Sequence, residues 1–299
     1  AGQDREALKK QAVTREFRPV PFGVTASMAL TNTLRAFDST NVVAKLEGSD
    51  PVLKNEFVVF TAHWDHFGIG APVNGDTIYN GALDNATGTA GMIEVARAFA
   101  RTSPRPKRSL VFVAVTAEEQ GLLGSEHYAV SPVYPLAKTL ASINMDGLNP
   151  YGPTKDIEIV GHGASDLDEV ARGVAATQGR DVKPETEPEK GGYYRSDHFP
   201  FAKQGVPALN AGAGQDHVGK PAGYGKQKRD EYTAKHYHAP SDEIQADWDV
   251  AGMVQDCEFY YGVGLRVANG TAWPQWAPGN EFRATREAML KAAGTGGSR

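Results

Sequence analysis

From Asn41 onwards, short apolar runs alternate regularly with segments that have the periodicity of amphipathic helices. Apolar runs of this length are typical of buried strands, whereas apolar residues spaced three and four apart are typical of helices. The alternation predicts a mostly parallel or mixed sheet with helices on its faces. The expected strands are 42–46, 57–62, 109–116, 140–144, 157–160 and 207–210, and the expected helices are 89–101, 122–129, 167–177, 199–204 and 248–267.

Residues 1–40 do not share this alternation. They combine a short amphipathic pattern over 7–13 with a proline-rich turn at Pro19 and an alternating stretch. We therefore expect an N-terminal appendage over 1–40 and one large domain over 41–299. The segment 215–236 has no clear period and is expected to be a loop, either on the plain surface or at the mouth of a binding site.

Charge and cysteine content exclude several classes of protein. The formal net charge is -5 and no dense basic run is present, so the electrostatic footprint of a nucleic-acid binder is missing and small molecules or peptides are the expected partners. The longest apolar run, 110–115, is too short to span a membrane. Cys257 is the only cysteine, so any metal site within the chain must use His, Asp and Glu.

Acidic and histidine residues follow several expected strands, at the edge where α/β sheets bind their ligands. His63 and Asp65 lie two residues apart after the strand 57–62, so their side chains point to the same side of an extended chain. One of them can bind a metal ion while the other orients it. Asp84 lies in a glycine-flanked turn ahead of a predicted helix, where Asp84 or Asn85 can instead be the helix N-cap.

Further candidates follow later strands. Glu118 and Glu119 come after the most apolar strand, and such a pair is either solvated or divided into a ligand and a base. Asp146 ends another apolar strand, and His238 lies in a proline-containing turn with Asp242 four residues later. Together these residues offer the nitrogen and oxygen ligands that zinc accepts without sulfur. Because they exceed what one ion needs, we expect two ions.

The other histidines are weaker candidates, because a single histidine in a turn or on a helix more often has a structural role. His236 is the main rival of His238, since it lies only two residues earlier in the chain. The histidines expected to be structural are His66, His127, His162, His198, His217 and His236.

At these positions the sequence resembles the M28 family of metallopeptidases, which includes zinc aminopeptidases that use two ions together. The resemblance covers residues 41 to about 268. It implies the zinc-peptidase fold, an α/β protein with a three-layer α/β/α sandwich around a mixed, mostly parallel sheet. The matching blocks are AHWDH (62–66), ALDNATG (82–88), EEQGLLGS (118–125), NMD (144–146), SDHFPF (196–201) and HAPSD (238–242).

The resemblance also implies how the ligands are divided. His63 and Asp146 correspond to the ligands of one zinc ion, and Glu119 and His238 correspond to those of the other. Asp84 corresponds to the ligand that bridges both. The expected cofactors are therefore two Zn²⁺ ions per chain.

Further roles follow from the same resemblance. Glu118 corresponds to the general base, and Tyr237 to a tyrosine that helps to hold the oxyanion in some members. Asp65 corresponds to the carboxylate behind the first histidine, and Asp242 is expected to support the ligands in the same way. Arg195 is either a binding residue for a substrate carboxylate or simply solvated.

The function implied is that of a metallo-exopeptidase acting on peptides, with removal of N-terminal amino acids favoured over carboxypeptidase activity. A glutaminyl-cyclase-like acyltransferase with a single zinc ion is the alternative enzyme class, but cyclases do not keep the full ligand set for the first ion. A third alternative is a non-catalytic binding ectodomain of the same fold, in which metal ligands have been lost. In this sequence none of the expected ligands is lost. The presence of both His63 and Asp146 favours hydrolysis.

Residues 1–40 resemble the tail of a protease-associated domain, which is usual in exported members of the family. We therefore expect a periplasmic or secreted protein. The first residues are polar and include no apolar leader, so any signal peptide is expected to have been removed. The sequence does not predict an oligomeric state.

Overall fold

The computed structural model describes residues 2–294, which separate into two units. The first unit ends at Asp38 and contains one helix, α1 (Arg5–Ala12). Asp4 caps this helix, because its carboxylate accepts hydrogen bonds from two backbone N–H groups in the first turn. The other described residues of this unit form no regular helix or strand.

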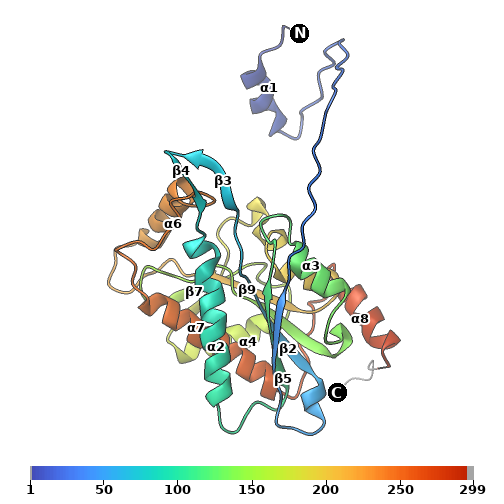
Figure 1. Ribbon diagram of the computed structural model, residues 1–299, viewed down its shortest axis with the longest axis vertical. Helices are drawn as coiled ribbons and strands as arrows, with labels where there is room; N and C mark the ends of the chain where they lie inside the picture. The colour runs from blue at the N-terminus through green and yellow to red at the C-terminus, as the bar shows by residue number, and fades with distance from the viewer. Residues whose placement is uncertain (1, 295–299) are drawn as a thin grey trace. The chain divides into compact units, whose positions relative to one another are not determined.

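The second unit begins at Ser39, close to the boundary predicted after residue 40, and contains a seven-stranded mixed sheet (Figure 1). The strands lie in the order β1-β5-β2-β6-β9-β7-β8. The four central strands β5, β2, β6 and β9 are parallel to one another. β1 is antiparallel to its neighbour β5, and β7 is antiparallel to its neighbour β9. The strands are β1 (Val42–Leu46), β2 (Phe57–His63), β5 (Ser109–Val115), β6 (Thr139–Asn144), β7 (Asp156–Ile159), β8 (Asp181–Pro184) and β9 (Ala208–Ala213).

Helices cover both faces of the sheet. On one face, Phe60 of the sheet belongs to the same buried cluster as Phe99 of α2, together with apolar residues of α4 and α7. On the other face, Val59 packs in a cluster with Tyr128 of α3, together with residues of α5 and α8. The predicted α/β/α sandwich is therefore confirmed. The helices are α2 (Gly88–Arg101), α3 (Leu123–Val130), α4 (Leu167–Thr177), α5 (His198–Lys203), α7 (Ala251–Asn269) and α8 (Arg283–Ala292).

The segment 215–236 is not the loop that its sequence predicts. It contains helix α6 (Tyr224–Lys235), so this prediction is wrong for the second half of the segment. The helix is polar almost throughout and only Gly225 is buried. It is supported by ion pairs one turn apart, such as Lys226 with Asp230 at 2.6 Å. Because no apolar face is buried, apolar periodicity does not reveal this helix.

A two-stranded hairpin, β3 (Gly68–Val73) and β4 (Asp76–Tyr79), is also absent from the sequence prediction. Its strands are largely exposed, so they lack the apolar alternation of a half-buried strand. Asn74 and Gly75 between them have φ values of 53° and 90°. This dipeptide favours two-residue hairpin turns of that geometry, and it is the signal that could have located the hairpin. Strand β8 and helix α8 are not predicted either.

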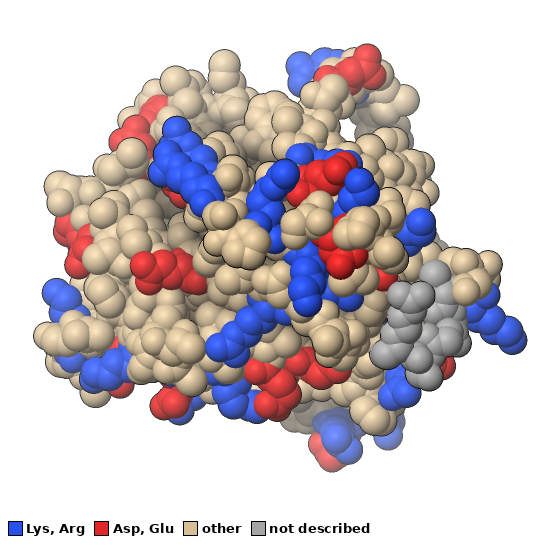
Figure 2. Space-filling model, turned by 90° about the horizontal axis from the view of Figure 1, so that it is seen from below, with Lys and Arg blue, Asp and Glu red and all other residues tan. Residues whose placement is uncertain are grey.

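The surface shows charges of both signs. On the face seen from below, Lys and Arg side chains are interspersed with Asp and Glu side chains (Figure 2). This mixture is in keeping with a formal net charge of only -5. Across residues 2–294, no helix combines the length and the apolar character needed to cross a lipid bilayer.

Candidate metal and catalytic site

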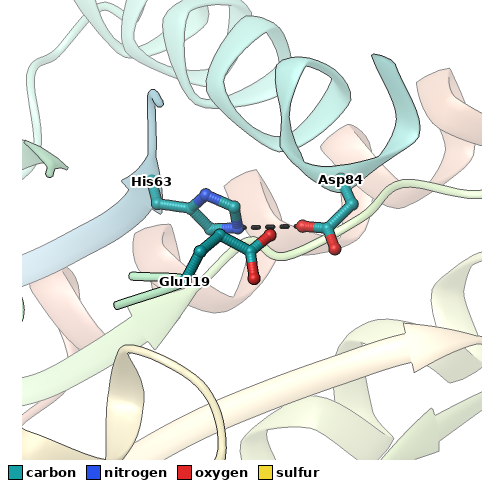
Figure 3. Close-up of side chains that lie close together, drawn as sticks. All are labelled: His63, Asp84 and Glu119. Carbon is teal, nitrogen blue, oxygen red and sulfur yellow. Dashed lines mark ion pairs between the residues drawn. The ribbon is translucent and has the colours of Figure 1, made fainter. Parts of the chain in front are cut away.

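The central parallel strands end at one edge of the sheet and bring the predicted ligands together there. β2 ends at His63, Glu119 follows β5, and Asp146 follows β6. Asp84 reaches the same edge from a turn ahead of α2. Figure 3 shows that His63, Asp84 and Glu119 point toward one another, and one ligand atom of each lies within 4.8 Å of the other two.

His63 is buried and has both ring nitrogens in polar contacts. Nε2 lies 3.0 Å from Asp84 Oδ1 and 3.3 Å from Asp146 Oδ1. Nδ1 lies 2.9 Å from the backbone carbonyl oxygen of Asp65. Because a carbonyl oxygen only accepts hydrogen bonds, this contact places a proton on Nδ1. The neutral ring then offers the lone pair of Nε2 to a metal ion.

Asp65 contacts His63 through a different atom from the one expected. The sequence predicts that the Asp65 carboxylate lies behind the imidazole, whereas the backbone carbonyl oxygen takes that place. The carboxylate instead accepts hydrogen bonds from Thr116 Oγ1 at 2.6 Å and from the N–H of Ala117 at 2.8 Å. Asp65 therefore connects the first histidine to the turn that carries the two glutamates.

Asp84 lies in the irregular turn Ala82–Thr87, where its own φ and ψ are -112° and 88°. Asp242 is buried and fixes this turn, because its carboxylate accepts the N–H groups of Leu83 and Asp84 at 3.0 and 3.1 Å. Neither Asp84 nor Asn85 is the N-cap of α2, which is Thr87, but Asn85 Oδ1 accepts the N–H group of Gly88 at the start of the helix at 3.0 Å. The Asp84 carboxylate is left to face the site.

The two oxygens of Asp84 face two different histidines. Oδ1 lies 3.0 Å from His63 Nε2, and Oδ2 lies 3.5 Å from His238 Nε2. Glu119 Oε2 lies 3.0 Å from the same nitrogen of His238. The ring of His238 stacks on that of Tyr237, with the ring centroids 3.7 Å apart. The predicted ligands therefore form two groups that share Asp84.

The electrostatics of the site call for bound cations. Burial raises the pKa of the Glu118 carboxyl group to about 9, and the negative charge of Asp146 adds to this effect. Burial lowers the pKa of His63, but the adjacent carboxylates of Asp146 and Asp84 outweigh burial and hold the pKa above its usual range. In the metal-free protein, protons therefore neutralise charge that metal ions can neutralise instead.

The directions of the ligand atoms also fit metal ions. His63 Nε2 and Glu119 Oε1 are buried, yet neither has a partner in hydrogen-bond geometry within the described residues, despite close contacts. Buried polar atoms are normally satisfied, so such atoms require an explanation. A cation bound beside His63 and another beside Glu119 would give these atoms their missing partners. Nitrogen and carboxylate oxygen ligands in this number suit zinc.

Comparison with known proteins identifies the family. Residues 41–261, well over half of the chain, match the family model described as "Peptidase family M28". The chain belongs to this family. The sequence resemblance to the M28 family is thereby confirmed. The proposed remnant of a protease-associated domain lies outside the matched residues and stays a prediction.

Relatives of this M28 peptidase include "Leupeptin-inactivating enzyme 1" of Streptomyces exfoliatus, which is 30% identical over 194 residues. That match covers 63% of this chain and 40% of the relative. Aminopeptidase NAALADL1 of Mus musculus is 29% identical over 131 residues, which cover 42% of this chain and 16% of the relative. The chain thus spans less than two thirds of the length of the curated relatives it matches.

Solved structures show the same fold. A peptidase M28 precursor from Shewanella amazonensis superimposes with a TM-score of 0.56 at 24% identity, over 80% of this chain and 46% of that one. BSAP, a zinc aminopeptidase from Bacillus subtilis, superimposes with a TM-score of 0.55 at 22% identity, over 81% of this chain and 52% of that one. At these identities the likeness establishes the fold of the M28 peptidase.

A cleft of about 410 Å³ leads to the ligand groups of the M28 peptidase. Arg195 lies at this cleft and is exposed, and the structure gives its guanidinium group no ion pair or hydrogen bond to any residue within 2–294. Lys203, also at the cleft, pairs with Glu126 at 3.0 Å. The remaining residues that line the cleft are Glu118, Glu119, Gly121, Leu122, Tyr194, Phe199, Pro200, Tyr237 and His238.

His66, which is expected to be a structural residue, is placed at the site of this peptidase. Its Nδ1 lies 2.7 Å from Glu119 Oε1, and both side chains are buried. The only sequence signal for this position is that His66 is the second histidine of the AHWDH block. The rival candidate His236 instead contacts the backbone oxygen of Ser241 at 2.9 Å, so His238 alone of the two joins the ligand group.

Proposed function

We propose that this M28 peptidase is an exopeptidase that holds two zinc ions and releases N-terminal amino acids from peptides. The observation that carries this proposal is the position of Asp84, whose two oxygens face two separate groups of ligand atoms. His63 and Asp146 belong to one group, and Glu119 and His238 to the other. A shared carboxylate of this kind is the usual bridge in two-metal sites.

Glu118 is the proposed general base. When bound, the zinc ions supply a Lewis acid that polarises the scissile carbonyl and acidifies water at the site. The Glu118 carboxylate takes the proton of the attacking water and returns it to the leaving amine. Its place supports this role, since it lines the cleft and is only 9% exposed. Burial raises the pKa of its carboxyl group in the metal-free protein, and bound cations would lower that pKa so that the carboxylate can accept a proton.

Tyr237 is the proposed oxyanion donor. It lines the same cleft, and its ring lies against that of His238. Burial raises the pKa of the Tyr237 hydroxyl to about 12, so it keeps its proton through the neutral pH range. A protonated hydroxyl can donate a hydrogen bond to the oxygen on which charge develops.

The direction of cleavage rests on two observations that favour different activities. The carboxylates gathered at the site attract the ammonium group of a peptide N-terminus, and related proteins are named aminopeptidases. Arg195 favours carboxypeptidase activity, because its unpaired guanidinium group at the cleft can bind a terminal carboxylate in two-point geometry. We propose aminopeptidase activity with Arg195 as a binding residue for a carboxylate farther along a short peptide.

Matched peptides test this proposal. We expect N-acetylation of a tripeptide to abolish cleavage, whereas C-terminal amidation leaves cleavage in place. Arg195→Gln should raise KM about tenfold for the free tripeptide, the cost of one hydrogen-bonded charge contact, and leave KM for the amidated peptide unchanged. Cleavage that survives acetylation and fails on amidation would instead establish a carboxypeptidase.

The single-zinc cyclase alternative is tested by metal content. Active, unchelated protein with one zinc ion per chain would favour acyl transfer over the two-ion hydrolysis proposed above. A periplasmic or secreted location stays a prediction from the resemblance.

A further inference from the structure

The cleft at the site contains two cationic side chains with different surroundings. The Arg195 guanidinium group has no ion pair or hydrogen bond to any residue within 2–294. Lys203 Nζ lies 3.0 Å from Glu126 Oε1, and both side chains of this pair are partly exposed. Lys203 Nζ also lies 5.7 Å from the centre of the Phe199 ring, a distance at which the ring face attracts a cation. Of the two cations, Arg195 alone presents an uncompensated charge to a bound molecule.

The Glu126–Lys203 pair connects two helices at the cleft. Glu126 belongs to α3, and Lys203 is the last residue of α5. Leu122 and Phe199, which also line the cleft, lie four positions before them in the chain. Residues four apart on a helix lie on the same face, so each helix places an apolar side chain one turn before its charged one. The cleft therefore has an apolar section and a charged section about 5.4 Å apart along the helices.

The apolar section is held in place next to the proposed base. The Leu122 N–H donates to the carbonyl oxygen of Glu118 at 2.8 Å, so the section continues directly from the turn that carries the glutamates. The Phe199 ring lies edge-on to Tyr194, with the ring centroids 5.2 Å apart. The Tyr194 hydroxyl group donates in turn to Glu281 at 3.0 Å. These contacts give the apolar section a defined wall.

The ion pair discriminates between side chains that enter the apolar section. If Arg195 binds the C-terminal carboxylate of a short peptide, as proposed above, the part of the peptide after the scissile bond occupies this cleft. A charged side chain there meets a like charge in the Glu126–Lys203 pair and must separate the pair to gain a partner of its own. An apolar side chain avoids both costs.

We infer that the Glu126–Lys203 pair is a specificity-determining element that restricts the residue after the scissile bond to apolar side chains. The inference rests on the proposed aminopeptidase function and names its substrate class, short peptides with an apolar second residue. Arg195 anchors the carboxylate of such a peptide, and the ion pair keeps Lys203 from acting as a second anchor.

The test uses tripeptides with free termini that differ only in the second residue, which is Leu, Glu or Lys. The wild type should prefer the Leu peptide. Glu126→Gln leaves the Lys203 charge without its partner, so kcat/KM for the Glu peptide relative to the Leu peptide should rise about fivefold, as for a partly exposed ion pair. Lys203→Gln leaves Glu126 unpaired and should raise the relative kcat/KM of the Lys peptide by a similar factor.

Two controls accompany these variants. Glu187 and Lys190 form a partly exposed ion pair at 2.8 Å that does not line the cleft, so Glu187→Gln should keep the wild-type preference. Glu126→Lys combined with Lys203→Glu forms the ion pair again with its charges exchanged and should restore the preference for the Leu peptide. Salt at about 1 M should reduce both shifts, because charges are then screened beyond about 3 Å.

Three results would overturn the inference. The first is a wild type that prefers the Glu or Lys peptide. The second is an unchanged preference in both Glu126→Gln and Lys203→Gln. The third is a preference that shifts only when the first residue of the peptide is varied, since the cleft would then receive the released amino acid.

Failure of the proposed function is recognised separately from the wild type alone. A wild type that cleaves N-acetylated tripeptides and releases no N-terminal residue contradicts the proposed function and, with it, the inference. A wild type that releases N-terminal residues, together with variants that show no shift in charge preference, contradicts the inference alone.

Discussion

Asp65 serves two parts of the site through different atoms. Its carbonyl oxygen faces His63 Nδ1, and its carboxylate binds the N–H of Ala117. Ala117 has a φ of 54°, a conformation that costs a residue with a side chain on the order of 1 kcal/mol. The turn that carries Glu118 and Glu119 therefore depends on the Asp65 carboxylate, whereas the imidazole does not.

We accordingly expect Asp65→Asn to lower kcat/KM roughly 10-fold to 100-fold while the ion beside His63 stays bound. The amide keeps one acceptor oxygen but loses the charge that holds the Ala117 turn. Asp50→Asn is the matched control, because Asp50 likewise accepts two backbone N–H groups, those of Val52 and Leu53, away from the site. Kinetics and zinc analysis are measured together. Complete loss of one ion from Asp65→Asn would mean that its carboxylate is itself a ligand.

At the scale of elements, helix α6 is connected to the bridging ligand through Asp242. Tyr232 of α6 donates its hydroxyl proton to Asp242 Oδ2 at 3.1 Å. The same carboxylate accepts the N–H groups of Leu83 and Asp84 in the turn ahead of α2. A polar surface helix thereby supports the residue that faces both ligand groups.

Asp242→Ala should be much more damaging than Tyr232→Phe. The alanine variant leaves two N–H groups of the Asp84 turn without their acceptor, at about 1–3 kcal/mol each, and should weaken both ions because Asp84 serves both groups. The phenylalanine variant loses one hydrogen bond, worth about 1 kcal/mol, and should keep both ions. Chemical denaturation of the metal-free variants and zinc titrations measure the two effects. Similar losses in both variants would contradict this account of the turn.

The parts of the fold that the sequence predicts are those that bury apolar surface. The runs that became β2, β5 and β6 are almost wholly buried, so their ends, and with them His63, Glu119 and Asp146, are located correctly. Helix α6 and the β3–β4 hairpin bury little, so no periodicity marks them.

Contacts between individual side chains could not be predicted from the sequence for another reason. The distance of 2.7 Å between His66 and Glu119 joins residues from two different strand ends, and only the register of β2 against β5 brings them together. The same holds for the different roles of Asp84 and its neighbour Asn85. From the sequence alone, either residue could contact the N-terminus of the helix. Which of them faces the ligands depends on Asp242, far along the chain.

For the whole molecule, the buried carboxyl groups make stability depend on pH and on metal. Burial raises the pKa of Glu118 to about 9 and that of Asp197 to about 7, both above the usual range. The folded state therefore binds protons more tightly than the unfolded state. The resulting stabilisation is complete below the unfolded pKa values and is lost as pH rises through the folded ones.

We thus expect the Tm of the metal-free protein to fall between about pH 7 and pH 9, because below that range the lowered pKa of buried His198 acts in the opposite direction. Zinc should reduce this dependence, because bound cations favour the ionised carboxylates. Glu118→Gln removes one of the two groups and should flatten the slope, with most of the change above pH 7. Thermal scans across pH measure it. A metal-free Tm that rises over this interval, or an unchanged slope in Glu118→Gln, would contradict the prediction.

The central claim is that the adjacent glutamates divide into a base and a ligand. Glu118→Gln keeps the shape of the side chain but removes the base, so turnover should fall by at least the 10²–10⁴-fold typical of general-base loss, with both ions bound. Glu119→Gln removes a charged ligand, so one ion should bind weakly and activity should partly recover at high zinc.

Zinc content measured beside turnover of a chromogenic amino-acid amide is the most direct test of this division. The account predicts two zinc ions per chain in inactive Glu118→Gln and fewer than two in Glu119→Gln. A Glu118→Gln protein that loses metal while Glu119→Gln keeps both ions would reverse the two roles and contradict the proposed site.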